Sequence, residues 1–144
     1  MIDDPAYFAG FPKLTSRKIK SPIDPSYNCF AFAVEITDIP WAPVKQGGVY
    51  WPAGVPFEDT LDAYSQAYAS RGYEPCQSAD IELGYEKIVI YELDGKPWHA
   101  ARQLENGNWV SKMGSAVDIE HPEADSLEGP MGHVALIMRR ERTQ

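Results

Sequence analysis

Three closely spaced strand-like segments in the second half of the chain constrain the fold more than any other feature. "KIVIYEL" (87–93) is a buried-strand pattern, and "WHAARQL" (98–104) and "NWVSKM" (108–113) follow it at short intervals. The sequence "DGKP" separates the first two and "ENG" the last two, and both are typical of tight turns between paired strands. With an acidic loop over 114–131 and "GHVALIMRR" (132–140) as the last strand, the sequence predicts an antiparallel sheet.

Two helices are predicted ahead of these strands. In residues 27–37, apolar side chains recur at helical intervals counted from Cys29, and the segment is apolar on nearly every side, which is typical of a buried helix. Ser26 or Asn28 is expected to cap this helix. "PFEDTLDAYSQAYASRGY" (56–73) is the second helix, with acidic residues in its first turn and a glycine near its end.

Helices followed by an antiparallel sheet indicate the α+β class. The chain has 144 residues, which suits one domain, and we expect residues 27–144 to form it. Residues 1–26 carry four prolines and little periodicity. They are expected to form an irregular N-terminal arm that packs through Tyr7, Phe8 and Phe11.

The composition argues against several classes of partner. The formal net charge is −8, which is unfavourable for nucleic acid because phosphate binding needs a basic patch. The sequence has no apolar run of membrane-spanning length and no signal-peptide core, so we expect a cytoplasmic protein with no membrane partner. Cys29 and Cys76 are then expected to be free thiols, and three scattered histidines form no zinc motif, so neither metal nor cofactor is predicted.

Cys29 is the candidate nucleophile, because it lies at the predicted start of the buried helix. Free backbone N–H groups and the helix dipole there lower a thiol pKa, and thiolate is the nucleophilic form. His99, near the start of its strand, is the candidate general base. A cysteine on a helix followed by a histidine on a later strand is the papain-type order. A buried cysteine that only packs in the core is the alternative explanation.

The sequence also resembles a family of uncharacterised bacterial domains, and it is similar to NlpC-type and CHAP-type papain-like hydrolases. The stretches that carry the resemblance are "YNCFAFAVEI", "GYEPC", "YEKIVIYELDGKPWHAARQLENGNWVSKMG" and "DIEH", within residues 27–138. The resemblance implies a papain-like core in which a central N-terminal helix packs on an antiparallel sheet. It also implies Cys29 as nucleophile and His99 as base, and it specifies no substrate.

The third catalytic position of NlpC-type enzymes, a polar residue on the next strand, falls on Ser111. Whether Ser111 can support His99 depends on the hairpin register. A two-residue loop at Asn106-Gly107 would turn Ser111 away from His99, whereas a three-residue loop with Gly107 in the left-handed region would place Ala101 opposite Ser111 and both on the face of His99. Two other groups are fallback partners for His99, a backbone carbonyl and the side chain of His121.

Several aromatic residues are candidate substrate contacts. Tyr27, two positions before Cys29, is a candidate hydrogen-bond donor to an oxyanion, and Trp51 and Trp98 are candidates for lining a groove. Two functions follow. The first is a cysteine hydrolase or acyltransferase that acts on an amide or ester of a peptide-like substrate through Cys29 and His99. The second is a catalytically inactive papain-like fold that binds a peptide or a partner protein.

Overall fold

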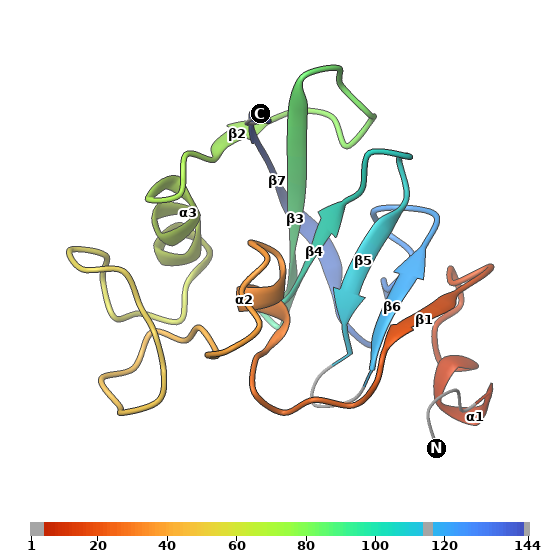
Figure 1. Ribbon diagram of the computed structural model, residues 1–144, viewed down its shortest axis with the longest axis horizontal. Coiled ribbons are helices and arrows are strands. Elements are labelled where there is room, and N and C mark those ends of the chain that lie inside the picture. Colours follow the sequence, from red (N-terminus) through yellow and green to blue (C-terminus); the bar gives the residue numbers. More distant parts are fainter. Residues whose placement is uncertain (1–4, 114–116, 143–144) are drawn as a thin grey trace.

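The computed structural model describes residues 5–113 and 117–142, which form a mixed α and β fold dominated by one antiparallel sheet (Figure 1). The sheet has seven strands in the spatial order β1-β6-β5-β4-β3-β7-β2. The strands are β1 (Lys18–Ser21), β2 (Glu74–Cys76), β3 (Tyr85–Leu93), β4 (Lys96–Gln103), β5 (Trp109–Lys112), β6 (Asp118–His121) and β7 (His133–Glu141). The helices are α1 (Pro5–Phe8), α2 (Cys29–Phe32) and α3 (Leu61–Ala69). The α+β class is confirmed, and the papain-like core stays a prediction.

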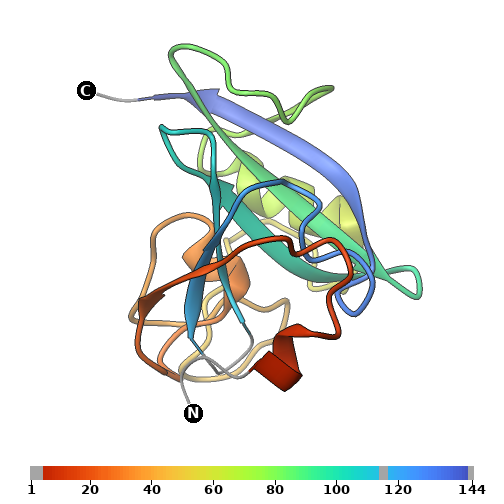
Figure 2. The same ribbon diagram turned by 90° about the vertical axis from the view of Figure 1, so that its right-hand side faces the viewer.

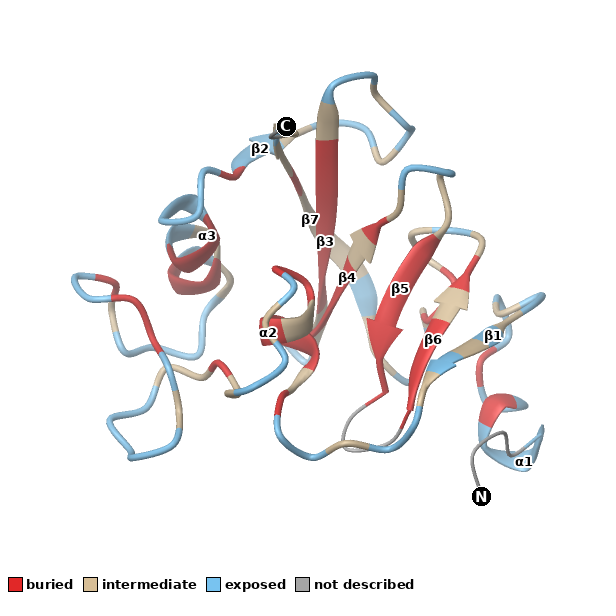
Figure 3. Ribbon diagram, viewed as in Figure 1, coloured by how far each residue is buried: buried red, intermediate tan, exposed pale blue. Residues whose placement is uncertain are grey.

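The four strands predicted from the sequence are present as β3, β4, β5 and β7. β3 lies between β4 and β7, and Ile88 is paired with Arg102 on one side and Met138 on the other. Both pairings run along most of β3, so this strand is an interior strand of the sheet, and most of it is buried, as its colour in Figure 3 shows.

The sheet carries a buried cluster of side chains on each face. Alternate residues of a strand point to opposite faces, so neighbours in the sequence belong to different clusters. The helix-face cluster combines sheet residues with buried residues of α2, α3 and the loops between residues 27 and 73, and its sheet members are Ile88, Ile90, Ala100 and Met138. The loop-face cluster is covered by the N-terminal arm and the segment after β6, and its main members are Val89, Tyr91, Ala101, Trp109, Ile119, Phe8, Phe11 and Leu127.

The helix predicted over residues 27–37 is much shorter than expected, because only Cys29–Phe32 are α-helical. Glu35 has a left-handed backbone conformation (φ 64°). Its N–H donates to the carbonyl of Phe32, and the N–H of Ile36 donates to the carbonyl of Ala31. These two bonds form a Schellman-type end, which closes the helix after one turn. Ala33 and Val34, which follow the helix, are buried without being helical.

The second predicted helix is also shorter than the sequence pattern. Thr60 is its N-cap and accepts a hydrogen bond from the N–H of Ala63, so α3 begins at Leu61 and the acidic residues 58–59 precede it. It ends near Gly72, which has φ of 92°. No helix in the described parts of the chain has the length and apolar character needed to cross a membrane.

Two strands were not predicted at the β1 edge of the sheet. The arm 1–26, expected to be irregular, contains α1 and β1, and the loop expected over 114–131 contains β6. β6 pairs with β5 on one side and β1 on the other, which joins the arm to the sheet (Figure 2). Phe8 and Phe11 of the arm are buried, as predicted, whereas Tyr7 is exposed.

Candidate functional site

Cys29 is the first residue of α2, and the residue before it fixes its position. The Asn28 side chain accepts hydrogen bonds from the backbone N–H groups of Ala31 (3.0 Å) and Trp41 (3.1 Å). Its amide also donates to the carbonyl of Trp41 (2.7 Å). Asn28, one of the two predicted candidates, is therefore the N-cap, and it also connects the start of α2 to the loop at Trp41.

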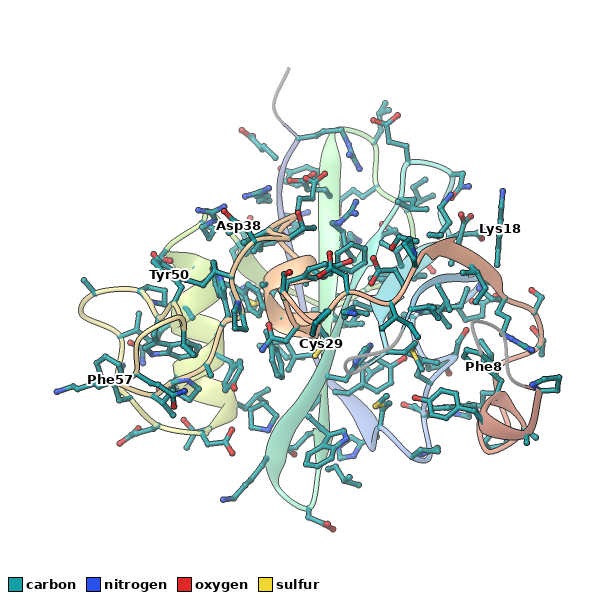
Figure 4. The ribbon with its side chains drawn as sticks, turned by 60° about the horizontal axis from the view of Figure 1, so that its bottom comes forward. Phe8, Lys18, Cys29, Asp38, Tyr50 and Phe57 are labelled. Atoms are coloured by element: carbon teal, nitrogen blue, oxygen red, sulfur yellow. The ribbon has the colours of Figure 1, made fainter. Side chains whose placement is uncertain are left out.

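The Cys29 side chain is buried where α2 meets the sheet (Figure 4). Burial raises the pKa of the Cys29 thiol to about 12, although the backbone N–H groups of Ala100, Cys29 and Phe30 act in the opposite direction. Desolvation disfavours the charged thiolate, and here it outweighs the stabilisation from the helix start. The thiol is protonated at neutral pH, and the direction of the shift is opposite to the one expected from the sequence.

His99 lies on the other face of the sheet. It is paired with Tyr91 across β3 and β4, and the two rings make an edge-to-face contact with centroids 5.4 Å apart. The next residue, Ala100, is the one that belongs to the helix-face cluster with Cys29. Since successive residues of β4 alternate between faces, the structure does not bring the Cys29 sulfur and the His99 ring together.

Burial also changes the protonation of His99. Only 1% of its surface is exposed, and burial together with His121 lowers the pKa of His99 to about 3. Its Nε2 atom has no hydrogen-bond partner among the described residues. His99 is therefore a buried, neutral imidazole on the loop face of the sheet.

The β4–β5 hairpin has the three-residue loop that places Ser111 on the face of His99. Arg102 pairs with Val110, and Gly107 has φ of 91°. This register puts Ala101 opposite Ser111, which is the second of the two alternatives considered from the sequence.

Ser111 nevertheless supports a different histidine. Its Oγ lies 2.7 Å from Nε2 of His121, and Nδ1 of His121 lies 3.0 Å from the carbonyl oxygen of Glu123. A carbonyl can only accept, so Nδ1 carries the proton and Nε2 accepts from the Ser111 hydroxyl. Burial, the largest influence, lowers the pKa of His121 to about 4. His121 and Ser111 thus form a satisfied polar pair inside the loop face, and His121 also contributes to the lowered pKa of His99.

Tyr27 has a structural partner. Its hydroxyl donates to the carboxylate of Asp118, which also accepts from the hydroxyl of Ser21. The ammonium group of Lys112 lies 4.9 Å from the centre of the Tyr27 ring. All the polar groups named here lie between the arm, β5 and β6, so Tyr27 anchors the chain entering α2 to the sheet.

Trp98 is the most exposed tryptophan, at 54%, and it lines a pocket on the helix face. The pocket has a volume of about 510 Å³. We call it the Trp98 pocket, and its lining residues are Phe30, Asp59, Tyr64, Leu93, Asp94, Lys96, Pro97 and Trp98. Trp51 does not line it, but the Trp51 ring packs edge-on against Tyr64 with centroids 5.0 Å apart. Of the three predicted substrate contacts, Trp98 is the one that lines this pocket within the described parts of the chain.

Comparison with protein families matches residues 18–139 to the domain of unknown function DUF7689. The chain belongs to this family. No curated protein and no solved structure matches it. None of these comparisons links the DUF7689 domain to NlpC-type or CHAP-type hydrolases.

Several residues of the Trp98 pocket in this DUF7689 domain were not identified from the sequence. Phe30 directly follows Cys29, the candidate nucleophile, and Tyr64 belongs to an ordinary apolar stripe of α3. Asp59 precedes α3 and Asp94 follows β3. Acidic residues at such positions are typical of caps and turns. The only available signal was Trp98, a large aromatic residue directly after a turn.

The burial of Cys29 predicts an order of thiol reactivity. Iodoacetamide at pH 8 should label Cys76 faster than Cys29 by at least about tenfold, because Cys76 is partly exposed and Cys29 is buried as a neutral thiol. Mass spectrometry of tryptic peptides at successive times measures both rates, and labelling in denaturant provides the control in which both thiols react. Faster labelling of Cys29 at mildly acidic pH would contradict this placement and favour an activated nucleophile.

Proposed function

We propose that the protein is a non-catalytic binding domain that holds a peptide segment of a partner protein in the Trp98 pocket. The observation that carries the proposal is a half-exposed tryptophan beside a pocket of about 510 Å³. Ligand pockets have volumes of this order, and exposed tryptophans are enriched among residues that dominate binding energy.

The positions of the catalytic candidates support binding over hydrolysis. A cysteine hydrolase needs a base within hydrogen-bond reach of its nucleophile. Cys29 belongs to the helix-face cluster, whereas His99 pairs with and contacts Tyr91 of the loop-face cluster. In this proposal the resemblance to NlpC-type and CHAP-type hydrolases reflects a related fold whose cleft binds without cleaving.

The construction of the pocket suits a peptide. Phe30 comes from α2, Tyr64 from α3, and the segment 93–98 from the β3–β4 turn, so packed elements hold the walls in place. Phe30 and Tyr64 contact each other with ring centroids 4.5 Å apart. A second pocket of about 580 Å³ opens on the loop face, but it offers mostly carboxylate, amide and small side chains. Aromatic walls provide more binding free energy than such a lining.

A selection from a random peptide library, followed by calorimetry with the synthetic peptides, tests the proposal. Trp98→Ala is expected to weaken the selected peptides by at least about tenfold, because the loss of an aromatic anchor typically costs about 2 kcal/mol. Phe57→Ala is the matched control, since Phe57 is exposed to a similar extent (45%) but does not line the pocket.

Two outcomes would overturn the proposal. One is a set of peptides that bind equally well to the wild type and to Trp98→Ala. The other is turnover of amide or ester substrates by the wild type that is lost in Cys29→Ala, which would establish the cysteine hydrolase.

A further inference from the structure

The Trp98 pocket combines aromatic rings with carboxylates. Phe30, Tyr64 and Trp98 supply three rings, and Asp59 and Asp94 supply two carboxylates. The face of an aromatic ring attracts cations within about 6 Å of its centre, and tryptophan does so most strongly. Rings and carboxylates in one pocket therefore favour the same class of ligand, an organic cation.

Asp59 is electrostatically coupled to one of these rings. Burial first, and then the charge of Asp59, raises the pKa of the Tyr64 phenol. This coupling indicates that the negative charge of Asp59 lies near the Tyr64 ring, which Trp51 contacts edge-on. A cation that enters the Trp98 pocket would meet this charge.

Neither carboxylate is neutralised inside the protein. Within residues 5–113 and 117–142, Asp59 and Asp94 take part in no ion pair, and Lys96 is the one basic residue in the lining. Two carboxylates against one ammonium leave the pocket with a net charge of −1, and the whole chain carries −8. Both values attract a positively charged partner.

We propose that the occupant of the Trp98 pocket is the side chain of a lysine or arginine in the bound peptide. This inference rests on the proposed function and specifies its ligand. The aliphatic part of such a side chain packs along Phe30, Pro97 and Trp98, and its charged end reaches Asp59 and Asp94. Lysine and arginine commonly bind in this way, with an apolar stem on aromatic surface and a charged head at a polar rim.

Small amides that mimic single residues test the inference without a known partner. The probes are N-acetyl-lysine methylamide, N-acetyl-arginine methylamide and the neutral N-acetyl-norleucine methylamide, titrated into ¹⁵N-labelled protein. The indole N–H signal of Trp98, assigned with Trp98→Phe, reports occupancy of the pocket. The two basic probes are expected to shift this signal with at least about fivefold higher affinity than norleucine, and added salt should reduce the difference.

Charge variants provide the second measurement. Asp59→Asn and Asp94→Asn are each expected to weaken the lysine probe about two- to fivefold, the size typical of one exposed ion pair. Asp38→Asn is the control, because it removes the same charge from an exposed residue outside the pocket. An equal loss in Asp38→Asn would show a general charge effect and would contradict a specific role for Asp59 and Asp94.

The outcomes separate this inference from the proposed function. If norleucine and lysine probes bind equally well, the pocket is an apolar site, so the cation inference is wrong while peptide binding stands. If neither the probes nor any selected peptide perturbs the Trp98 signal, the proposed function itself is wrong.

Discussion

Lowering the pH from 8 to 5 is expected to reduce the free energy of unfolding by about 4 kcal/mol, through two buried histidines. The pKa of His99 is lowered to about 3 and that of His121 to about 4, both chiefly by burial. In the unfolded chain each titrates near the ordinary value of about 6.5. Below that pH the unfolded state binds protons that the folded state excludes. Stability is therefore complete above about pH 6.5 and is lost as the pH falls toward the folded-state values, by about 2 kcal/mol per histidine at pH 5.

Urea denaturation at pH 8, 6.5 and 5 measures this loss. The pH range isolates the histidines, because carboxylates with lowered pKa, such as Glu82 and Glu128, lose their contribution only below about pH 4.5. His99→Phe keeps an aromatic ring against Tyr91 and should remove about half of the pH dependence. His133→Gln changes an exposed histidine and should leave it intact. Equal stability at pH 8 and pH 5 would show that His99 and His121 are not buried as neutral groups.

The sequence predicted the strands of the sheet because their signals are local. β3 contains the continuous apolar run 88–91, and the turns on either side of β4 contain residues that favour tight reversals. The hairpin register was also narrowed to two loops, one of which the structure shows. Strand identity and hairpin register depend on residues within a few positions of each other, so one sequence is sufficient to infer the strands and to limit the register to two alternatives.

The candidate catalytic pair could not be judged from the sequence because the face taken by His99 is set by distant contacts. β4 contains a histidine followed by two alanines, and a strand can direct either the histidine or the first alanine toward the helix face. α2 packs closely on β4, and fully buried Ala31 and Ala100 permit that approach. A histidine at the position of Ala100 would be too large for the same contact. The two alanines after His99 were the sequence feature that could have indicated which face of β4 packs against α2.

The length of α2 and the presence of β6 were missed for a different reason. Glu35 adopts a left-handed conformation that is uncommon for glutamate, so the end of the helix carries no glycine signal. β6 contains two acidic residues and was therefore taken for part of a solvated loop. In the fold Asp118 accepts hydrogen bonds from Ser21 and Tyr27, and Glu120 from Asn108, so tertiary partners outweigh local composition.

Replacing Gly132 with alanine is expected to lower the free energy of unfolding by at least about 4 kcal/mol, which exceeds the usual effect of a single substitution. Gly132 has φ of 86°, and a Cβ atom there would lie 1.9 Å from the carbonyl oxygen of Glu92 and 2.6 Å from its carbon. These are backbone atoms at the end of β3, so no side-chain rotation can relieve the clash.

Gly84→Ala separates the strain of a left-handed alanine from the clash with the backbone of Glu92. Gly84 has nearly the same φ, 85°, but a Cβ atom there meets nothing within 4 Å. Its substitution should cost about 1 kcal/mol, the ordinary penalty for a left-handed alanine. Urea denaturation of both variants measures the difference, which is attributable to the contact with β3. Similar losses in the two variants would contradict the close approach of Gly132 to Glu92.

The same contact connects the start of β7 to the Trp98 pocket. Gly132 lies against Glu92 and Leu93, and Leu93 and Asp94 line the pocket. A Gly132→Ala protein that still folds must move the end of β3, and it should therefore bind selected peptides more weakly than Gly84→Ala does. Calorimetry with both folded variants measures this. Unchanged peptide affinity in a destabilised Gly132→Ala would show that the strain is absorbed by β7 and does not reach the pocket.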